Sequence, residues 1–459
     1  MKLPDGPKTP ALFQLIKWIA QPCDYLEECS EKYGDIYTLR LFGFPPLVFI
    51  SNPQGIQEIF SADAKYFDVG RTNNIARPLL GDNSLVIMDG SQHKRERKLL
   101  MPSFHGEKVK SYAEDICKIT ENVASCWQVN KSFIARNAMQ EITLNVIMQT
   151  IFGLSEGEKY REIKALLADW IDITGSPARS SFIFFKFLQL DLGAWSPWGK
   201  FVRQRKQIYD LLQEEIEARR ANPEKLANDI LSLMLCATDE DGQPMSEEQL
   251  KDELMTLLFA GHETTATALA WAFYWLAKNP QIEAKLLQEI DSLGQNPDPL
   301  DISRLPYLTA FCQETLRLYP VVPIAFGRIS NQDIEIMGRK FAAKTTFVPS
   351  IYSTHHREDL YPNSKEFKPE RFLERQYTPY EFLPFGGGVR LCLGYALAML
   401  EMKLVIATIV SKYRLELVEN KPIKPMRRGG TMAPSNGVPI VMTGLREAKK
   451  ADLVAGESK

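Results

Sequence analysis

The chain has 459 residues, 45% of them hydrophobic and 24% charged, and its 55 Lys and Arg nearly balance its 57 Asp and Glu. This balance excludes the basic excess of a nucleic-acid-binding protein and the composition of a disordered chain. The 7 cysteines are odd in number and contain no C-x-x-C pair, so they indicate neither a disulfide framework nor a zinc site and favour a reducing, cytoplasmic location.

The first apolar run, residues 11–20, is short and is interrupted by Gln14 and Lys17. A span needs about 20 apolar residues, so we expect no transmembrane anchor. We expect a helix packed on the body of the protein, and an amphipathic helix on a membrane surface is the alternative. Residues 35–50 then place β-forming side chains on both sides of a Gly/Pro turn, which predicts a hairpin.

Helical periodicity dominates residues 107–275, and strand signals return only late in the chain. Late strands are expected at 334–336, 346–349, 414–417 and on both sides of Ser435-Asn436-Gly437, whose Asn-Gly pair predicts a hairpin turn. No repeat or linker divides the chain. We expect one domain over 1–459, mainly α with a small β region: β-rich parts at 35–60, 330–350 and 414–443, and a helical core at 90–325 and 392–412.

A cluster of cations follows at residues 93–98, in a segment that predicts a charged helix. His93 and Arg97 lie one turn apart and can face inward together. Lys94, Arg95 and Lys98 then face outward, where they form either an ordinary solvated face or a docking surface for an acidic partner.

A long helix is predicted from Ser246, which begins a capping box with Gln249, to about residue 277. At 1.5 Å per residue it would be roughly 48 Å long. Its centre holds the polar residues 262–265, which are costly in lipid and argue against a membrane span.

The middle of this helix reads Ala260-Gly261-His262-Glu263-Thr264-Thr265. Small residues let a ligand approach the helix, and the acid and hydroxyl that follow can relay protons. The structural alternative is a threonine that bonds back to the carbonyl four residues earlier. The segment also resembles the start of a zinc-protease H-E-x-x-H helix, but Ala266 stands where the second histidine would be.

Residues 385–394 read Phe-Gly-Gly-Gly-Val-Arg-Leu-Cys-Leu-Gly and precede an apolar helical run that extends to Lys412. The glycines let the backbone approach a flat ligand, Phe385 can cover the Cys392 sulfur, and Arg390 can pair with a carboxylate. The expected position at a helix N-terminus favours thiolate over thiol. An isolated cysteine is more often an inert buried thiol, but this frame indicates a ligand of haem iron.

Two further segments contain charged residues that could belong to one ion-pair network. Glu314 and Arg317 lie three apart on one helix face, and Arg371 follows in the loop at 367–372. An exposed pair of this kind contributes only about 0.2–0.5 kcal/mol. With the segments at 260–265 and 385–394, they resemble the haem-thiolate monooxygenases, the cytochrome P450 family, in a soluble bacterial form similar to a cyanobacterial branch that oxidises fatty acids.

The resemblance implies the cytochrome P450 fold, a triangular helical prism with haem b between the long central helix and the cysteine loop and its helix. It implies that Glu263 and Thr264 deliver protons. The residues implied to hold haem are Cys392 on iron, with Phe385, Gly386 and Gly394 beside it, and Arg97, His93, Arg328 and Arg390 on the haem carboxylates. Relatives usually carry Trp in place of His93. Glu314, Arg317 and Arg371 are implied to form a buried network that holds the cysteine loop.

The implied activity is insertion of one oxygen atom from O2 into an apolar substrate, first of all the hydroxylation of a long-chain fatty acid. Because the chain has no flavin or iron–sulfur signature, electrons would come from NAD(P)H through a separate ferredoxin-type protein, and we expect a monomer. The expected pocket residues are Leu85, Val86, Phe259, Ala260, Val321, Val322, Ala325 and Thr431. In the early strand only Tyr37 and Arg40 could anchor a carboxylate.

Three alternatives stay open from the sequence. The substrate could be a terpenoid or another lipophilic molecule. The protein could be a haem-thiolate peroxygenase or isomerase, although the Glu263-Thr264 pair argues for dioxygen. It could also be a haem sensor, for which a relay helix has no evident use.

Overall fold

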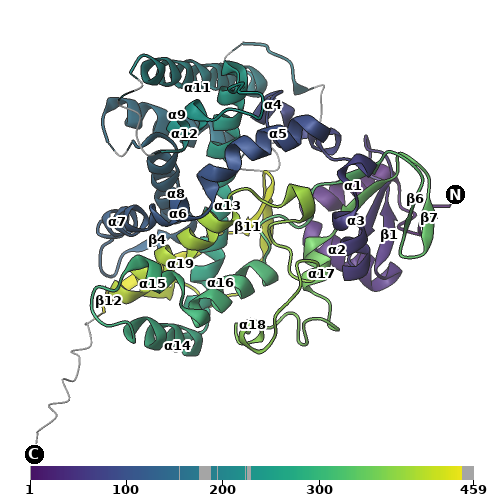
Figure 1. Ribbon diagram of the computed structural model, residues 1–459. Helices are drawn as coiled ribbons and strands as arrows, with labels where there is room; N and C mark the ends of the chain where they lie inside the picture. The colour runs from purple at the N-terminus through teal and green to yellow at the C-terminus, as the bar shows by residue number, and fades with distance from the viewer. Residues whose placement is uncertain are drawn as a thin grey trace, which may run out of the picture.

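The structure is a computed structural model that describes residues 2–154, 156–174, 188–193, 195–222, 224 and 229–446. The helices are α1 Ala11–Ala20, α2 Pro22–Tyr33, α3 Pro53–Ser61, α4 Arg77–Leu80, α5 Gly90–Leu100, α6 Glu107–Lys110, α7 Ala113–Ala124, α8 Ala135–Phe152, α9 Glu158–Thr174, α11 Pro197–Arg220, α12 Ile230–Cys236, α13 Glu247–Lys278, α14 Pro280–Asp291, α15 Pro299–Ser303, α16 Pro306–Leu318, α17 Ile351–His355, α18 Arg371–Glu374 and α19 Tyr395–Lys412. The strands are β1 Ile36–Leu39, β2 Leu47–Ile50, β3 Phe67–Asp68, β4 Ser132–Ile134, β5 Arg328–Ser330, β6 Ile334–Ile336, β7 Arg339–Phe341, β8 Thr346–Pro349, β9 Tyr413–Leu417, β10 Pro425–Arg428, β11 Thr431–Pro434 and β12 Pro439–Leu445. Helices dominate and the strands are short, which confirms the predicted mainly α fold with a small β region (Figure 1).

A five-stranded sheet in the order β1-β2-β8-β5-β3 lies with the N-terminal helices at the right of Figure 1. The predicted hairpin is confirmed, because β1 and β2 pair antiparallel with Tyr37 opposite Phe49. The predicted strand at 346–349 joins it as β8, which runs parallel to β2 with Phe347 opposite Val48. This pairing brings the segment that follows α16 beside the start of the chain.

Helix α1 packs on this sheet by one face only. Its Leu15 and Trp18 are buried, and the Trp18 ring meets the Phe49 ring edge-on at 5.8 Å. Leu12 and Phe13 on its other face are exposed. Within the described part of the chain, no helix is both long and apolar enough to cross a membrane.

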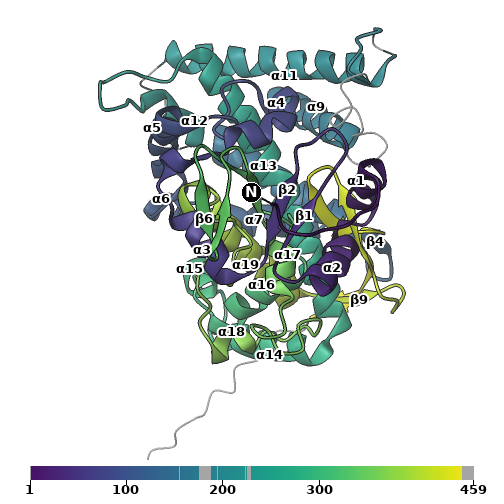
Figure 2. The same ribbon diagram turned by 90° about the vertical axis from the view of Figure 1, so that its right-hand side faces the viewer.

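Helix α13 runs through the middle of the molecule, and α11 lies across the top in the view of Figure 2. Helix α13 begins as predicted with a capping box. The Gln249 N–H donates to Ser246 Oγ at 3.2 Å, and the Ser246 N–H donates to Gln249 Oε1 at 2.7 Å. Asn279 caps its end and Pro280 begins α14. Helices α8, α16 and α19 pack along it, so it positions most of the surrounding elements.

The C-terminal strands correct one prediction. The turn at Asn436-Gly437 exists, since the Gly437 N–H donates to the Pro434 carbonyl at 3.1 Å. However, it joins β11 to β12, which lie in different sheets: β11 pairs with β10, and β12 lies between β4 and β9. The hairpin predicted across Asn-Gly is therefore wrong, because β12 finds its partners far away in sequence.

Trp271 holds the β10–β11 hairpin against α13. Its indole N–H donates to the Met432 carbonyl at 2.8 Å, and its ring stacks on Tyr319 at 3.9 Å. Trp271 is fully buried, and the half-buried Tyr319 packs against the same hydrophobic cluster. The late hairpin is thereby fixed beside the centre of the long helix.

Candidate active site

Cys392 lies in a tight loop directly before α19, whose N-cap residue is Gly394. The Cys392 N–H donates to the Phe385 carbonyl at 3.0 Å, and this bond closes the loop. The cysteine is exposed, yet the protein around it is dense enough that burial raises the pKa of its thiol. This is the pattern of a group that faces an opening inside the protein.

The electrostatics of Cys392 differ from the prediction. The Gly394 backbone N–H and the Arg97 guanidinium lower the pKa of the thiol, but burial outweighs them and the net shift is upward. Position before a helix therefore does not ionise this sulfur by itself. Coordination to a metal cation deprotonates a thiol outright, and a metal ligand is the chemistry that fits the site.

The glycines of the loop have two different tasks. A Cβ on Gly387 would lie 2.4 Å from the Phe60 ring, and one on Gly388, whose φ is +63°, would lie 2.7 Å from the Phe60 carbonyl oxygen. These two glycines let the loop pack on α3, which the sequence did not indicate. A Cβ on Gly386 would come no nearer than 3.9 Å to the Arg390 carbonyl oxygen, and one on Gly394 would meet no described atom within 4 Å, so these two leave room for a flat ligand.

Four nitrogen-bearing side chains gather near the cysteine: His93, Arg97, Arg328 and Arg390. Burial lowers the pKa of Arg328 to about 9 and that of Arg390 to about 10. Burial and repulsion from the three guanidinium groups lower the pKa of His93 to about 3, so its ring is neutral and keeps one N–H donor. Burial also lowers the pKa of Arg97, while Cys392 raises it. Burial disfavours the charged form of these guanidinium groups, and a bound carboxylate would compensate their charge, so the cluster is suited to bind carboxylates.

Arg390 also holds the segment that contains Leu85. Its Nη1 donates to the Leu85 carbonyl at 3.0 Å, and its Nη2 donates to the Met88 carbonyl and to Asp89 Oδ1. On the other side, the Leu85 N–H donates to Glu253 Oε1 of α13 at 2.5 Å. The peptide groups of Leu85 thus join the cysteine loop to the long helix.

Glu263 of α13 points toward α8. Its Oε2 accepts from Arg136 Nη2 and its Oε1 from Gln140 Nε2, both at 2.5 Å. The neighbouring His262 Nδ1 lies 2.9 Å from Thr143 Oγ1, also on α8. Both oxygens of the predicted relay acid are therefore engaged away from Thr264.

Thr264 follows the structural alternative in this conformation, because its hydroxyl donates to the Ala260 carbonyl at 2.6 Å. Ala260 is exposed although residues 254–258 and 262–263 around it are buried. Gly261 has another role than the predicted gap for a ligand, because a Cβ there would lie 2.5 Å from Ile147 Cδ1. A side chain at position 261 would require the end of the Ile147 side chain on α8 to shift, and Ala260 supplies the open surface.

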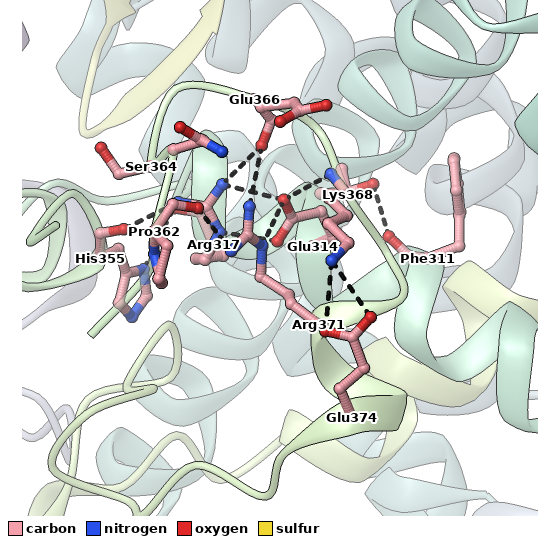
Figure 3. Close-up of polar contacts among 12 residues, drawn as sticks. Phe311, Glu314, Arg317, His355, Pro362, Ser364, Glu366, Lys368, Arg371 and Glu374 are labelled. Atoms are coloured by element: carbon pink, nitrogen blue, oxygen red, sulfur yellow. Dashed lines mark hydrogen bonds and ion pairs between the residues drawn. The ribbon is translucent and has the colours of Figure 1, made fainter. Parts of the chain in front are cut away.

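Glu314, Arg317 and Arg371 form one buried network, shown in Figure 3. Arg317 donates to both carboxylate oxygens of Glu314, at 2.6 and 2.9 Å, and Arg371 Nε donates to Glu314 Oε1 at 3.1 Å. The Glu314 and Arg317 side chains are 0% exposed and that of Arg371 is 5% exposed. Both arginines also donate to the Glu366 carbonyl, which ties α16 to the segment before α18.

The predicted pocket residues come from four separate segments. Leu85 and Val86 lie on the segment that Glu253 and Arg390 hold through the Leu85 peptide groups. Phe259 packs edge-on against Trp170, with 5.9 Å between the ring centroids. Val321 is joined to β11, the strand of Thr431, because its carbonyl accepts the Met432 N–H at 2.8 Å. Val322 and Ala325 belong to the cluster under the five-stranded sheet.

One proposed carboxylate anchor is not available. Tyr37 is fully buried and stacks on Phe49 at 5.6 Å, so it is part of the core. Arg40 is exposed at the end of the early strand.

The outward cations of α5 are partly neutralised by acids from the segment after α12. Arg95 Nε donates to Asp239 Oδ2 at 2.5 Å, and Lys98 pairs with Glu240 at 2.5 Å. The segment at 93–98 is therefore less cationic than its sequence indicates, which weakens it as a docking surface for an acidic partner.

Residues 4–441, nearly the whole chain, match the family profile described as Cytochrome P450. The chain belongs to the cytochrome P450 family. It is 33% identical over 448 residues to the Mycobacterium tuberculosis protein named cytochrome P450 135B1, covering 97% of this chain and 93% of that protein. It is 30% identical over 443 residues to cytochrome P450 138 of the same species, covering 96% of each.

Solved structures agree with this P450 assignment. The retinoic-acid-bound cyanobacterial CYP120A1 superimposes with a TM-score of 0.84 at 27% identity, over 97% of this chain and 100% of that one. The haem domain of cytochrome P450DA superimposes with a TM-score of 0.81 at 23% identity, which supports the fold. This P450 is an oxidoreductase, a haem-thiolate monooxygenase.

The residues present fit haem. The thiol of Cys392 faces an interior opening, and two loop glycines leave room beside it. His93, Arg97 and Arg328 are suited to bind the two haem carboxylates, while the Nη atoms of Arg390 are already bonded to Leu85, Met88 and Asp89. Sequence reasoning missed Arg136 and Gln140, which bind Glu263, and His355, which accepts from the Leu383 N–H. Their partners lie on other elements, so no local pattern marks them.

Proposed function

We propose that this P450 hydroxylates long-chain fatty acids, with electrons from NAD(P)H delivered by a separate ferredoxin-type protein. The observation that carries the proposal is the exposed Ala260, one turn before Thr264 in a helix whose residues 252–258 and 265–274 are buried. An apolar methyl group open beside the hydroxyl, with the aromatic Phe259 next to it, supports a site for a hydrocarbon chain.

The cysteine, the cations and the Glu263-Thr264 pair would each have a separate role in this reaction. Bound haem would supply dioxygen activation, with thiolate donation favouring O–O cleavage. Cys392 would hold the iron, and His93, Arg97, Arg328 and Arg390 would hold the carboxylates. The Thr264 hydroxyl, now bonded to the Ala260 carbonyl, would turn to donate its proton. Glu263 would leave Arg136 and Gln140, take up a proton from solvent and pass it to Thr264.

A second candidate substrate class is a terpenoid acid. The solved neighbour CYP120A1 is bound to retinoic acid, which has a carboxylate and a long apolar chain in common with fatty acids. The shared chemistry supports an amphipathic acid, and the two classes differ in the shape of the apolar part.

The test is an optical titration of the haem-loaded enzyme with palmitate and, separately, retinoic acid. A carbon monoxide difference spectrum of the reduced enzyme first checks that thiolate is the ligand. We expect palmitate to shift the haem band and to be hydroxylated with oxygen, NADPH and a ferredoxin system. A shift with retinoic acid alone would replace the fatty-acid proposal by the terpenoid one, and no shift with either would refute both.

The same reconstitution separates the remaining alternatives. Product formation that requires dioxygen and reductant supports a monooxygenase over a peroxide-using enzyme, an isomerase or a sensor. We also propose a monomer folded as one domain over residues 1–459, which size-exclusion chromatography with light scattering and a single unfolding transition would check.

A further inference from the structure

His355, the last residue of α17, is tied to Arg317 in both directions. Its carbonyl accepts from Arg317 Nη1 at 2.8 Å, and its ring Nδ1 lies 3.2 Å from the Arg317 carbonyl (Figure 3). The residue is fully buried, and its ring stacks on Phe382 at 5.4 Å. The histidine is thus part of the buried network and touches the segment that leads to Cys392.

The other ring nitrogen reaches that segment directly. His355 Nε2 lies 3.0 Å from the backbone nitrogen of Leu383, and a backbone N–H can only donate. Nε2 must therefore be the unprotonated acceptor, which leaves the hydrogen on Nδ1 to donate to the Arg317 carbonyl. The imidazole is neutral in one tautomer, in line with burial and Arg317 lowering its pKa well below the usual range.

From Leu383 the bonds continue into the cysteine loop. The Leu383 carbonyl accepts the Gly386 N–H at 2.9 Å, and the Phe385 carbonyl accepts the Cys392 N–H at 3.0 Å. A parallel contact runs from the Tyr361 hydroxyl to the Glu381 carbonyl at 3.0 Å, but it ends before the loop begins. The arginines of the network donate to the carbonyls of His355, Pro362 and Glu366.

We infer that His355 is a positioning residue that transmits the Glu314-Arg317-Arg371 network to the loop carrying Cys392. The imidazole connects two segments: Nδ1 donates to the Arg317 carbonyl of α16, and Nε2 holds the backbone N–H of Leu383. The inference rests on Cys392 as the haem ligand and is independent of the substrate, so failure of the fatty-acid proposal leaves it untouched.

The test compares three substitutions at His355 with the same three at His356. Gln can place an amide oxygen where Nε2 accepts from Leu383, Asn reaches only the Nδ1 side, and Phe keeps a ring without either bond. His356 is the matched control because it follows in sequence, stacks on Tyr352 at 4.0 Å and bonds the Tyr352 carbonyl through Nδ1 at 2.8 Å.

Two measurements on the haem-loaded enzyme report the loop: hydrogen–deuterium exchange of the peptide spanning 381–394, and the rate of haem transfer to an excess of apomyoglobin. We expect His355→Asn and His355→Phe to speed both about tenfold, the factor that one lost buried hydrogen bond of about 1.4 kcal/mol represents. They should also lower the thiolate-ligated fraction in the carbon monoxide spectrum. His355→Gln should stay within about twofold of the unmodified enzyme.

Two results would overturn the inference. One is equal loop exchange and haem loss in the Asn variants of His355 and His356. The other is His355→Gln behaving like His355→Asn, because then the bond to Leu383 is not the cause. If His355→Phe does not fold, the comparison of Gln with Asn still decides between these outcomes.

Discussion

Arg136 of α8 and Glu263 of α13 form a buried ion pair, with Nη2 to Oε2 at 2.5 Å and side chains 9% and 10% exposed. Removing one partner leaves an uncompensated charge in the interior, which typically costs about 3–5 kcal/mol. We therefore expect Arg136→Met to lower the free energy of unfolding by about that amount in urea denaturation. The double variant Arg136→Met/Glu263→Gln should recover most of the loss, and strictly additive effects would contradict the pairing.

Thr264 carries the next prediction, because this half-buried residue lies one turn from the exposed Ala260. Thr264→Val keeps the shape and removes the proton donor. General acid–base groups contribute roughly 10²–10⁴-fold, so product formation should fall about 100-fold while electron consumption continues. Thr265→Val, at a fully buried neighbour, is the matched control. Equal product yields in the two variants would remove Thr264 from the relay.

Arg317→Ala should abolish stable haem incorporation. The substitution leaves the Glu314 carboxylate buried with only Arg371 as an ionic partner. It also removes the Arg317 donor from the His355 carbonyl and one of the two arginine donors from the Glu366 carbonyl. The expected cost is about 3–5 kcal/mol, measured as the yield of haem-bound protein per folded chain. The control is Lys368→Ala, whose exposed ammonium pairs with Glu374 at the surface. Normal haem binding in Arg317→Ala would show that the network does not hold the cysteine loop.

Buried neutral histidines predict loss of stability in mild acid. Burial lowers the pKa of His262 and of His356 to about 4. Unfolding returns each to an ordinary pKa near 6.5, so below that pH the unfolded chain binds more protons and the folded state loses stability as pH falls toward about 4. Each group adds a slope approaching about 1.4 kcal/mol per pH unit.

The measurement is urea unfolding at several pH values between 5 and 7. Glu253 and Glu401 act with the opposite sign, because burial raises the pKa of both and their neutral forms favour the folded state at low pH. The difference between the unmodified enzyme and His356→Gln isolates one histidine. That variant should show the flatter profile, and parallel profiles would show that His356 does not titrate on unfolding.

Local signals predicted the parts of the fold that local chemistry decides. The capping box at Ser246 and the proline after Asn279 set the ends of α13, and the Gly/Pro turn set the first hairpin. The Asn-Gly turn misled because its two strands pair with elements elsewhere, and nothing in a four-residue turn reports those partners.

The same limit applies to the site. The cysteine frame and the acid–alcohol pair are visible as short segments, but the partner of Glu263 lies 127 residues away on α8. The acids that neutralise Arg95 and Lys98 lie 144 and 142 residues away. Charges that are exposed in a sequence pattern can therefore be paired in the folded chain.

The double attachment of Leu85 has a consequence for how this enzyme could diversify. Both bonds, to Glu253 and to Arg390, are made by its peptide groups and not by its side chain. Under the prediction that Leu85 lines the substrate pocket, replacing its side chain during evolution would change which substrates fit, while the peptide bonds that join α13 to the cysteine loop would remain. Preference for a new molecule could then change without a loss of cofactor geometry.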